Sequence, residues 1–286
     1  MNKAANGWLS GFIGVAIFAG SLPATRIAVA DFDPTFLTCV RATIAALIGW
    51  GLLLTLRQPR PTRRQLPALI LCALGVVVGF PLFTALALQY ITSAHSIVFV
   101  GLLPLCTAIF AVIRGGERLR RPFWGFSLLG AAFVAGYAAM AEGEVSILGD
   151  SLMLAAIVVC GMGYAEGARL TKTLGGWQVI SWSLVISLPV MLPITLLTQP
   201  DSFQQIGMSA WLSLAYVSLF SMLLGFVFWY HGLAIGGIAA VGQLQLLQPF
   251  IGLTLAALLL GEHISSTMIW VTLAAIACVA GAKKFA

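Results

Sequence analysis

The chain has 286 residues, of which 60% are hydrophobic and only 8% are charged, and its mean hydropathy is +1.02. This composition excludes a water-soluble globular protein, because long apolar runs with few charges are typical of membrane-spanning helices. The formal net charge of +6 does not indicate a nucleic-acid partner, since basic residues held on the cytoplasmic side of a membrane explain it more simply. The five cysteines lie in apolar runs without CxxC spacing, so the sequence predicts no disulfide, metal site or cofactor.

Ten apolar segments follow one another along the chain, and each is predicted to be a transmembrane helix. They comprise residues 7–27, 34–56, 66–88, 94–113, 121–140, 147–169, 177–197, 210–232, 238–259 and 267–283. A cleaved signal peptide ending at 28–30 is the alternative for the first segment, although Pro23 and Arg26 lie late for such a signal. The chain divides near residue 145 into two halves, 1–145 and 146–286, with five segments each.

The basic residues predict the orientation of these segments. Thirteen of the 15 Lys and Arg residues lie at the termini or in alternate connections, whereas Arg26 and Arg41 lie near the opposite side. Basic connections stay on the cytoplasmic side of the membrane. We therefore predict a multi-pass protein of the plasma (inner) membrane with both termini in the cytoplasm and most acids on the outer side.

The second half repeats a pattern of the first at a constant offset of 145 residues. The matching pairs are Pro104 and Pro249, Glu117 and Glu262, and Gly136 and Gly281. Because five segments is an odd number, two similar halves would insert in opposite directions. The expected fold is thus an all-α membrane protein of ten transmembrane helices in two inverted five-helix repeats, an arrangement typical of secondary transporters.

This arrangement resembles the EamA-type drug/metabolite transporter superfamily. The resemblance rests on the repeated Pro–Glu–Gly pattern, on 18–21 (FAGS), on 87–90 (ALQY) and on Gly149-Asp150 at the start of the sixth segment. Phe18 stands where the family usually has a tryptophan. The resemblance implies export of small metabolites, amino acids or drugs through a central cavity. Tyr90, Thr92, His95 and Ser96 are similar to the same region of the YddG-like aromatic amino-acid exporters.

Polar and aromatic side chains within the apolar segments are the candidates for substrate binding. Three amides exposed to lipid would be costly, so at least two should face protein or a wet cavity. We interpret them as substrate contacts, with interhelical hydrogen bonding as the alternative. For the aromatic pair at 229–230 the alternative is anchoring at the membrane interface. The candidates are Tyr90, His95, Ser96, Phe99, Tyr164, Trp229, Tyr230, Gln243, Gln245 and Gln248.

Proline and glutamate residues at repeated positions are predicted to have structural roles. Pro104 and Pro249 lie in the middle of the fourth and ninth segments, where a proline removes a hydrogen-bond donor and kinks a helix. We expect these kinks to shape the cavity, either as hinges or as static bends. Glu117 and Glu262 are expected to cap the following helix or to pair with an arginine, with proton coupling as an alternative for Glu262.

Arg41 and Glu166 are charged residues that lie within predicted segments. Glu166 is expected to pair with Arg169, three residues later. Arg41 is expected to extend outward or to pair with Asp31 or Asp33, and the alternative is that it holds an anionic group of the substrate. Since no other acid lies deep in a segment, the sequence shows no carboxylate proton relay. This favours facilitated diffusion or exchange.

These features predict a secondary transporter rather than an enzyme. It would export amino acids, including aromatic ones, by alternating access through a central cavity between the repeats. Efflux of drugs or other amphipathic metabolites, a passive channel and an intramembrane enzyme are the alternatives, although no HExxH or GxSxG motif supports the last. The expected partners are a small-molecule substrate and the lipid bilayer. Glycine pairs at i, i+4, such as Gly75/Gly79 and Gly163/Gly167, predict close helix packing within the monomer or at a homodimer face.

Overall fold

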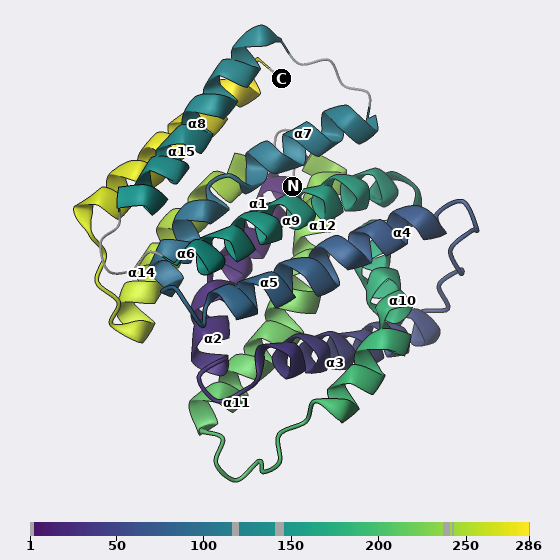
Figure 1. Cartoon of the computed structure of the whole chain (residues 1–286). Helices are drawn as coiled ribbons and strands as arrows, with labels where there is room; N and C mark the ends of the chain where they lie inside the picture. Colours follow the sequence, from purple (N-terminus) through teal and green to yellow (C-terminus); the bar gives the residue numbers. More distant parts are fainter. Residues whose placement is uncertain (1–2, 116–119, 141–145, 237–240, 242, 286) are drawn as a thin grey trace.

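A computed structural model of the chain describes residues 3–115, 120–140, 146–236, 241 and 243–285, and these form helices joined by short connections (Figure 1). The described helices before residue 145 are α1 (Lys3–Ala19), α2 (Ser21–Ala28), α3 (Pro34–Thr55), α4 (Leu66–Cys72), the π-helix η1 (Ala73–Gly79), α5 (Phe80–Ala87), α6 (Ser93–Val100), α7 (Leu103–Gly115) and α8 (Arg121–Met140). Those after it are α9 (Ile147–Leu174), α10 (Gly176–Leu197), α11 (Met208–Ala215), the π-helix η2 (Tyr216–Leu224), α12 (Gly225–Gly236), the 3-10 helix η3 (Gln243–Leu247), α14 (Gln248–Leu260) and α15 (Ser266–Lys284).

Seven helical stretches in this part of the chain are long and apolar enough to cross a membrane. They are Asn6–Ala28, Pro34–Thr55, Leu66–Ala87, Ser93–Arg114, Ile147–Leu174, Gly176–Leu197 and Met208–Gly232. Shorter apolar helices follow at Gln248–Leu260 and Ser266–Cys278. The prediction of a helical membrane protein is confirmed, whereas the count of ten spans stays a prediction.

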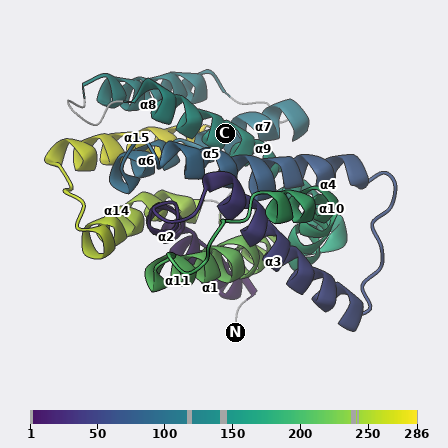
Figure 2. The ribbon, with the colours of Figure 1, turned by 60° about the horizontal axis from the view of Figure 1, so that its bottom comes forward.

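Helices from the two parts of the chain pack against one another in pairs. α1 packs along α12, α3 along α10, α8 along α15 and α6 along α14, while α9 packs against η1, α5 and α7. Figures 1 and 2 show α8 and α15 side by side at one edge of the molecule, and α3 beside α10 on the other side. Each of these contacts joins a helix before residue 145 to one after it, so the core lies between the two parts.

Glycines permit the closest of these helix contacts. A Cβ on Gly75 would lie 2.5 Å from the carbonyl oxygen of Val159 and 2.8 Å from the Cα of Gly163, and a Cβ on Gly232 would lie 2.7 Å from the backbone nitrogen of Gly11. Only a residue without a Cβ lets two helix backbones approach this closely. The predicted close packing of small residues within the monomer is confirmed at these two crossings.

The two repeated prolines lie where helical structure changes. α6 ends at Val100 and α7 begins at Leu103, so Pro104 is the second residue of a new helix. Pro249 is likewise the second residue of α14, directly after the 3-10 helix η3. In the first turn of a helix the missing proline N–H costs no hydrogen bond. Each proline thus lies where regular α-helix is interrupted, as expected at a kink, and its role in shaping the cavity stays a prediction.

Candidate functional site

Five aromatic side chains from three helices form a central aromatic cluster: Phe18 on α1, Tyr164 on α9, and Phe226, Trp229 and Tyr230 on α12. The ring centroids of Phe18 and Phe226 are 4.9 Å apart, and those of Tyr164 and Trp229 are 6.1 Å apart. All five side chains are buried, with Tyr230 fully inaccessible. Anchoring of Trp229 and Tyr230 at the membrane interface is therefore wrong. The indole Nε1 of Trp229 has no hydrogen-bond partner in the described part of the chain.

Small residues on neighbouring helices position this cluster. Gly14 of α1 faces the backbone of Trp229, where a Cβ would lie 3.0 Å from the Trp229 nitrogen. Gly167 of α9 lies directly against the phenol oxygen of Tyr230, in space that a Cβ would fill. The bulky rings of α12 can thus lie between α1 and α9 because these two helices present glycines to them.

A buried polar group joins α3, α2 and η2 near the aromatic cluster. Arg41 of α3 is 5% exposed, and its Nη2 donates to the Oγ of Ser221 at 3.3 Å. The hydroxyl oxygens of Ser221 and Ser21 are 2.7 Å apart. We call Arg41, Ser21 and Ser221 the arginine–serine group. The sequence predicted no site role for either serine, although Ser21 belongs to the stretch 18–21, because their positions in apolar helices resemble those of many other small residues.

The predicted partners of Arg41 are engaged elsewhere. Asp33 caps α3 by accepting from the backbone nitrogens of Thr35 and Phe36, and Asp31 accepts from the Gly207 nitrogen at 2.8 Å. Arg41 makes no ion pair with any residue that the structure describes, and its Nε has no hydrogen-bond partner among them. The expected outward extension or ion pair of Arg41 is therefore wrong, because the side chain turns inward to Ser221.

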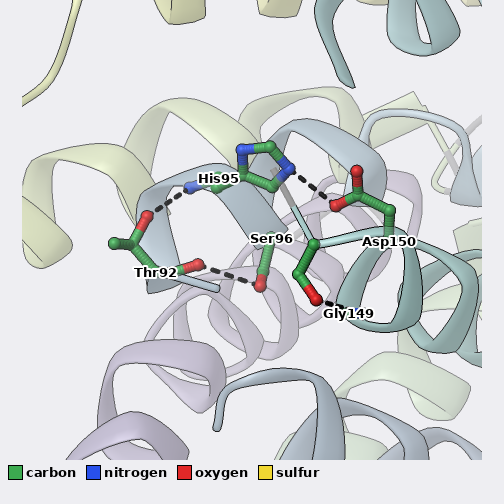
Figure 3. Close-up of polar contacts among 6 residues, drawn as sticks. Thr92, His95, Ser96, Gly149 and Asp150 are labelled. Atoms are coloured by element: carbon green, nitrogen blue, oxygen red, sulfur yellow. Dashed lines mark hydrogen bonds and ion pairs between the residues drawn. The ribbon is translucent and has the colours of Figure 1, made fainter. Parts of the chain in front are cut away.

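A histidine–aspartate pair connects α6 with α9 (Figure 3). The Nε2 of His95 lies 2.8 Å from the Oδ1 of Asp150, and both residues are buried. The hydroxyl oxygen of Thr92 caps α6 by accepting from the His95 backbone nitrogen, and the Ser96 hydroxyl donates to the Thr92 carbonyl oxygen. The imidazole also packs against the ring of Phe99, with centroids 5.6 Å apart.

This pair changes the interpretation of His95 and Ser96. His95 does not line an open vestibule, because it is fully inaccessible, and its Nδ1 has no hydrogen-bond partner among the described residues. Asp150 is a functional candidate that sequence reasoning missed, although it was noted at the start of the sixth segment. Its position in the first turn of a membrane helix, one turn after the capping Ser146, was the available signal. The predicted substrate roles of His95, Ser96 and Phe99 stay predictions.

Glu262 caps a helix of the other half of the chain. Its Oε1 accepts from the Ser93 nitrogen at 2.9 Å and its Oε2 from the Ala94 nitrogen at 2.6 Å, at the start of α6. Glu262 was expected to cap a helix, and it does, but the expected helix was the one that follows it in the sequence. That part of the prediction was wrong, because the capped helix is α6. A carboxylate at a helix N-terminus satisfies free N–H groups and stabilises the helix dipole. Glu117, its counterpart in the repeat, lies outside the described residues.

Replacing Glu262 by alanine is expected to lower the free energy of unfolding by about 1–2 kcal/mol, because two N–H groups of α6 lose a charged acceptor. Thermal unfolding of the purified protein in detergent measures the effect. Asp201→Ala, which removes an exposed acid, is the matched control and should leave the midpoint unchanged. Equal midpoints for the two variants would contradict a stabilising role of this cap.

Two of the three predicted glutamines are buried close to α1 and α6. Gln245 is 4% and Gln248 is 7% exposed, which confirms that at least two of the amides face protein. Gln248 lies one turn before Gly252, which faces Ile97 of α6 and Ala19 of α1. Neither Gln245 Nε2 nor Gln248 Oε1 has a hydrogen-bond partner within the described residues. The side chain of Gln243 lies outside the described part of the chain.

Tyr90 and Glu166 are two further residues that the sequence singled out. Tyr90 is 52% exposed in the turn that follows α5, so the structure does not bring it into the group of buried candidates, and its substrate role stays a prediction. Glu166 on α9 accepts from Arg169 at 3.0 Å, as predicted, and also from the Nε of Arg114 on α7 at 2.6 Å. Because Glu166 is fully buried and Arg114 lies on α7, this ion pair holds α7 against α9.

Aromatic rings, amides and a guanidinium without a described ion-pair partner are thus buried between apolar helices from both parts of the chain. Buried polar groups within a membrane bundle are typical of proteins that carry solutes across the bilayer. The family model of EamA-like transporters matches residues 5–138 and again 147–282, and the chain belongs to this family. It is therefore a membrane transporter, and the intramembrane enzyme considered above has no support from the family.

Relatives of the chain agree with this assignment. It is 63% identical over 286 residues to "Uncharacterized transporter YdeK" of Bacillus subtilis (strain 168), covering all of both chains. It is 24% identical over 254 residues to "Probable terminal-alkyne amino-acid exporter" of Streptantibioticus cattleyicolor, covering 87% of this chain and 83% of that protein. A solved crystal structure with 19% identity shares the fold, with a TM-score of 0.68 over 97% of this chain.

Proposed function

We propose that this protein is a secondary transporter that exports amino acids, including aromatic ones. The observation that carries the proposal is the central aromatic cluster, which Phe18 and the α9 and α12 rings build from both parts of the chain. Rings of this kind suit an apolar or aromatic side chain. The buried amides of Gln245 and Gln248 and the guanidinium of Arg41 each keep an atom without a described hydrogen-bond partner, and these groups suit the polar groups of an amino acid. The relative named as an amino-acid exporter supports the same substrate class.

The proposed mechanism is alternating access between two inverted five-helix repeats, with ten transmembrane helices in all. The pairwise packing supports it. At the offset of 145 residues α1 corresponds to α9, and α12 to α5, so the contact of α1 with α12 is repeated by the contact of α9 with η1 and α5. The remaining two contacts join α3 to its counterpart α10 and α8 to its counterpart α15. A pseudo-two-fold axis in the membrane plane would produce this pattern of contacts. The proposed location is the inner membrane with both termini in the cytoplasm, which the distribution of basic residues favours.

Counterflow of radiolabelled L-phenylalanine into proteoliposomes tests the proposal. We expect saturable accumulation in vesicles preloaded with unlabelled L-phenylalanine, in the absence of a proton gradient. Trp229→Leu should raise the KM roughly tenfold, because Trp229 forms a wall of the cluster. Trp270→Leu is the matched control, since Trp270 is 70% exposed and should leave the KM within twofold.

Three outcomes would separate the alternatives. Accumulation only under an imposed proton gradient would replace facilitated exchange by proton-coupled transport. Competition by aromatic amines but by no amino acid would favour efflux of amphipathic drugs. Flux that neither saturates nor exchanges would indicate a passive channel and contradict the proposed carrier.

A further inference from the structure

Arg41 carries a buried positive charge for which the described residues provide no counter-charge. Its side chain is 5% exposed, and its Nη2 donates to the neutral Ser221 hydroxyl and to no other described residue. A buried charge without a counter-charge is costly inside a membrane protein, so such a residue is a candidate for ligand binding. We propose that Arg41 binds the carboxylate of the transported solute, an inference that rests on the proposed function and specifies how its site recognises substrate.

Four described acids that were predicted on the same side of the membrane as Arg41 have other partners. Asp31 accepts from the backbone N–H of residue 207, and Asp33 accepts from those of residues 35 and 36. Asp150 pairs with His95, and Glu262 caps α6. None of them lies within ion-pair distance of Arg41 in the described part of the chain. Because the described part of the chain offers Arg41 no carboxylate, we assign the role of its counter-ion to the solute.

The guanidinium has the donors that a carboxylate requires. Its Nε is buried without a hydrogen-bond partner, and the hydroxyl of Thr38, one turn earlier on α3, is also unpartnered in the described part. Arginine binds carboxylates through two parallel N–H donors, a geometry that includes Nε and one terminal nitrogen. Ser221 lies in the π-helix η2, and π-helical turns occur frequently at functional sites.

The arginine–serine group and the central aromatic cluster share two chain segments. Ser21 follows Phe18 by three residues across the junction of α1 and α2, and Ser221 precedes Phe226 by five residues across the junction of η2 and α12. The Tyr216 hydroxyl fixes the first junction by donating to the Ile17 carbonyl oxygen at 2.7 Å. The same two segments thus present a cation suited to a carboxylate and rings suited to an apolar group, the two features of an apolar or aromatic amino acid.

Competition at the wild-type protein tests the inference without altering the fold. Counterflow of radiolabelled L-phenylalanine is measured in the presence of 3-phenylpropionate, phenethylamine or L-phenylalaninamide. We expect the carboxylate to compete and the amine and the amide to fail at tenfold higher concentration. Competition by the amide as strong as that by L-phenylalanine would overturn carboxylate recognition while leaving the proposed amino-acid transport in place.

Variants then assign this recognition to Arg41. Arg41→Gln should raise the KM for L-phenylalanine roughly 10- to 100-fold, because a charge-assisted hydrogen bond to the ligand is lost, and Arg41→Lys should restore part of it. Arg26→Gln is the matched control, since Arg26 donates to the Leu88 carbonyl oxygen and should leave the KM within twofold. An unchanged KM in folded Arg41→Gln would overturn the proposal.

A binding measurement separates failure of the site from failure of the proposed function. If the wild-type protein carries no amino acid, the proposed function fails. An increase of the thermal unfolding midpoint by 3-phenylpropionate, present in the wild type and in Arg26→Gln but absent in Arg41→Gln, would still support an anion site. No increase in the wild type would overturn the site as well.

Discussion

Replacing Asp150 by alanine is expected to lower the free energy of unfolding by about 2–4 kcal/mol, among the largest effects of any single substitution in this protein. The buried imidazole of His95 would lose its only described partner for Nε2, 2.8 Å away, and no solvent reaches it. The pair also joins α6 to α9, so its loss should loosen contact between the two parts of the chain. Thermal and denaturant unfolding in detergent measure the change.

A double-mutant cycle provides the control for this prediction. His95→Ala should destabilise the protein by a similar amount, and the variant with both substitutions should be less destabilised than the sum of the two. The expected coupling energy is roughly 0.5–3 kcal/mol, because the second substitution removes a group that the first had left unpartnered. Strictly additive effects would show that the two side chains do not stabilise one another.

Replacing Gly75 by alanine is expected to disrupt the crossing of η1 and α9. The new Cβ would lie 2.5 Å from the Val159 carbonyl oxygen and 2.9 Å from the Gly163 nitrogen. Backbone atoms cannot rotate away as a side chain can, so the two helices must separate. We expect a loss of about 3 kcal/mol or more, at or above the upper end of overpacking effects. Folded yield and unfolding midpoint in detergent are the measurements.

Gly51 provides a matched control for Gly75. It also lies in a membrane helix, α3, but a Cβ at this position would meet nothing within 4 Å. Gly51→Ala should therefore be neutral or stabilising by up to about 1 kcal/mol, since alanine favours helix more than glycine does. If both substitutions had the same effect, helix propensity rather than close packing would explain the role of Gly75.

The sequence predicted the positions of most helices because transfer of a segment into lipid depends mainly on its composition. It also predicted local pairs correctly, such as Glu166 with Arg169, because residues three apart on a helix are neighbours whatever the tertiary structure. The sequence predicted an irregularity at Pro104 and Pro249 but not its form, since a proline at mid-segment is compatible with either a bent helix or the start of a new one.

Contacts between distant segments could not be predicted in the same way. Asp150 is 55 residues from His95, and Ser221 is 180 residues from Arg41. In a water-soluble protein the polar face of a helix identifies its outer side, but here most helices are apolar on all sides, so the sequence does not indicate which face is buried. The partners of Arg41, His95 and Glu262 followed only from the packed structure.

By itself, the sequence determined that this protein is a helical membrane protein with a repeated pattern and an asymmetric distribution of charge. These properties depend on composition and on spacing along the chain, which need no knowledge of packing. The tertiary structure alone decided that Trp229 and Tyr230 are buried in a shared aromatic cluster and that Arg41 turns toward Ser221 instead of a carboxylate. The physical reason is that burial and pairing depend on which helices meet, and in this protein glycine crossings such as Gly75 with Gly163 allow the helices to meet closely.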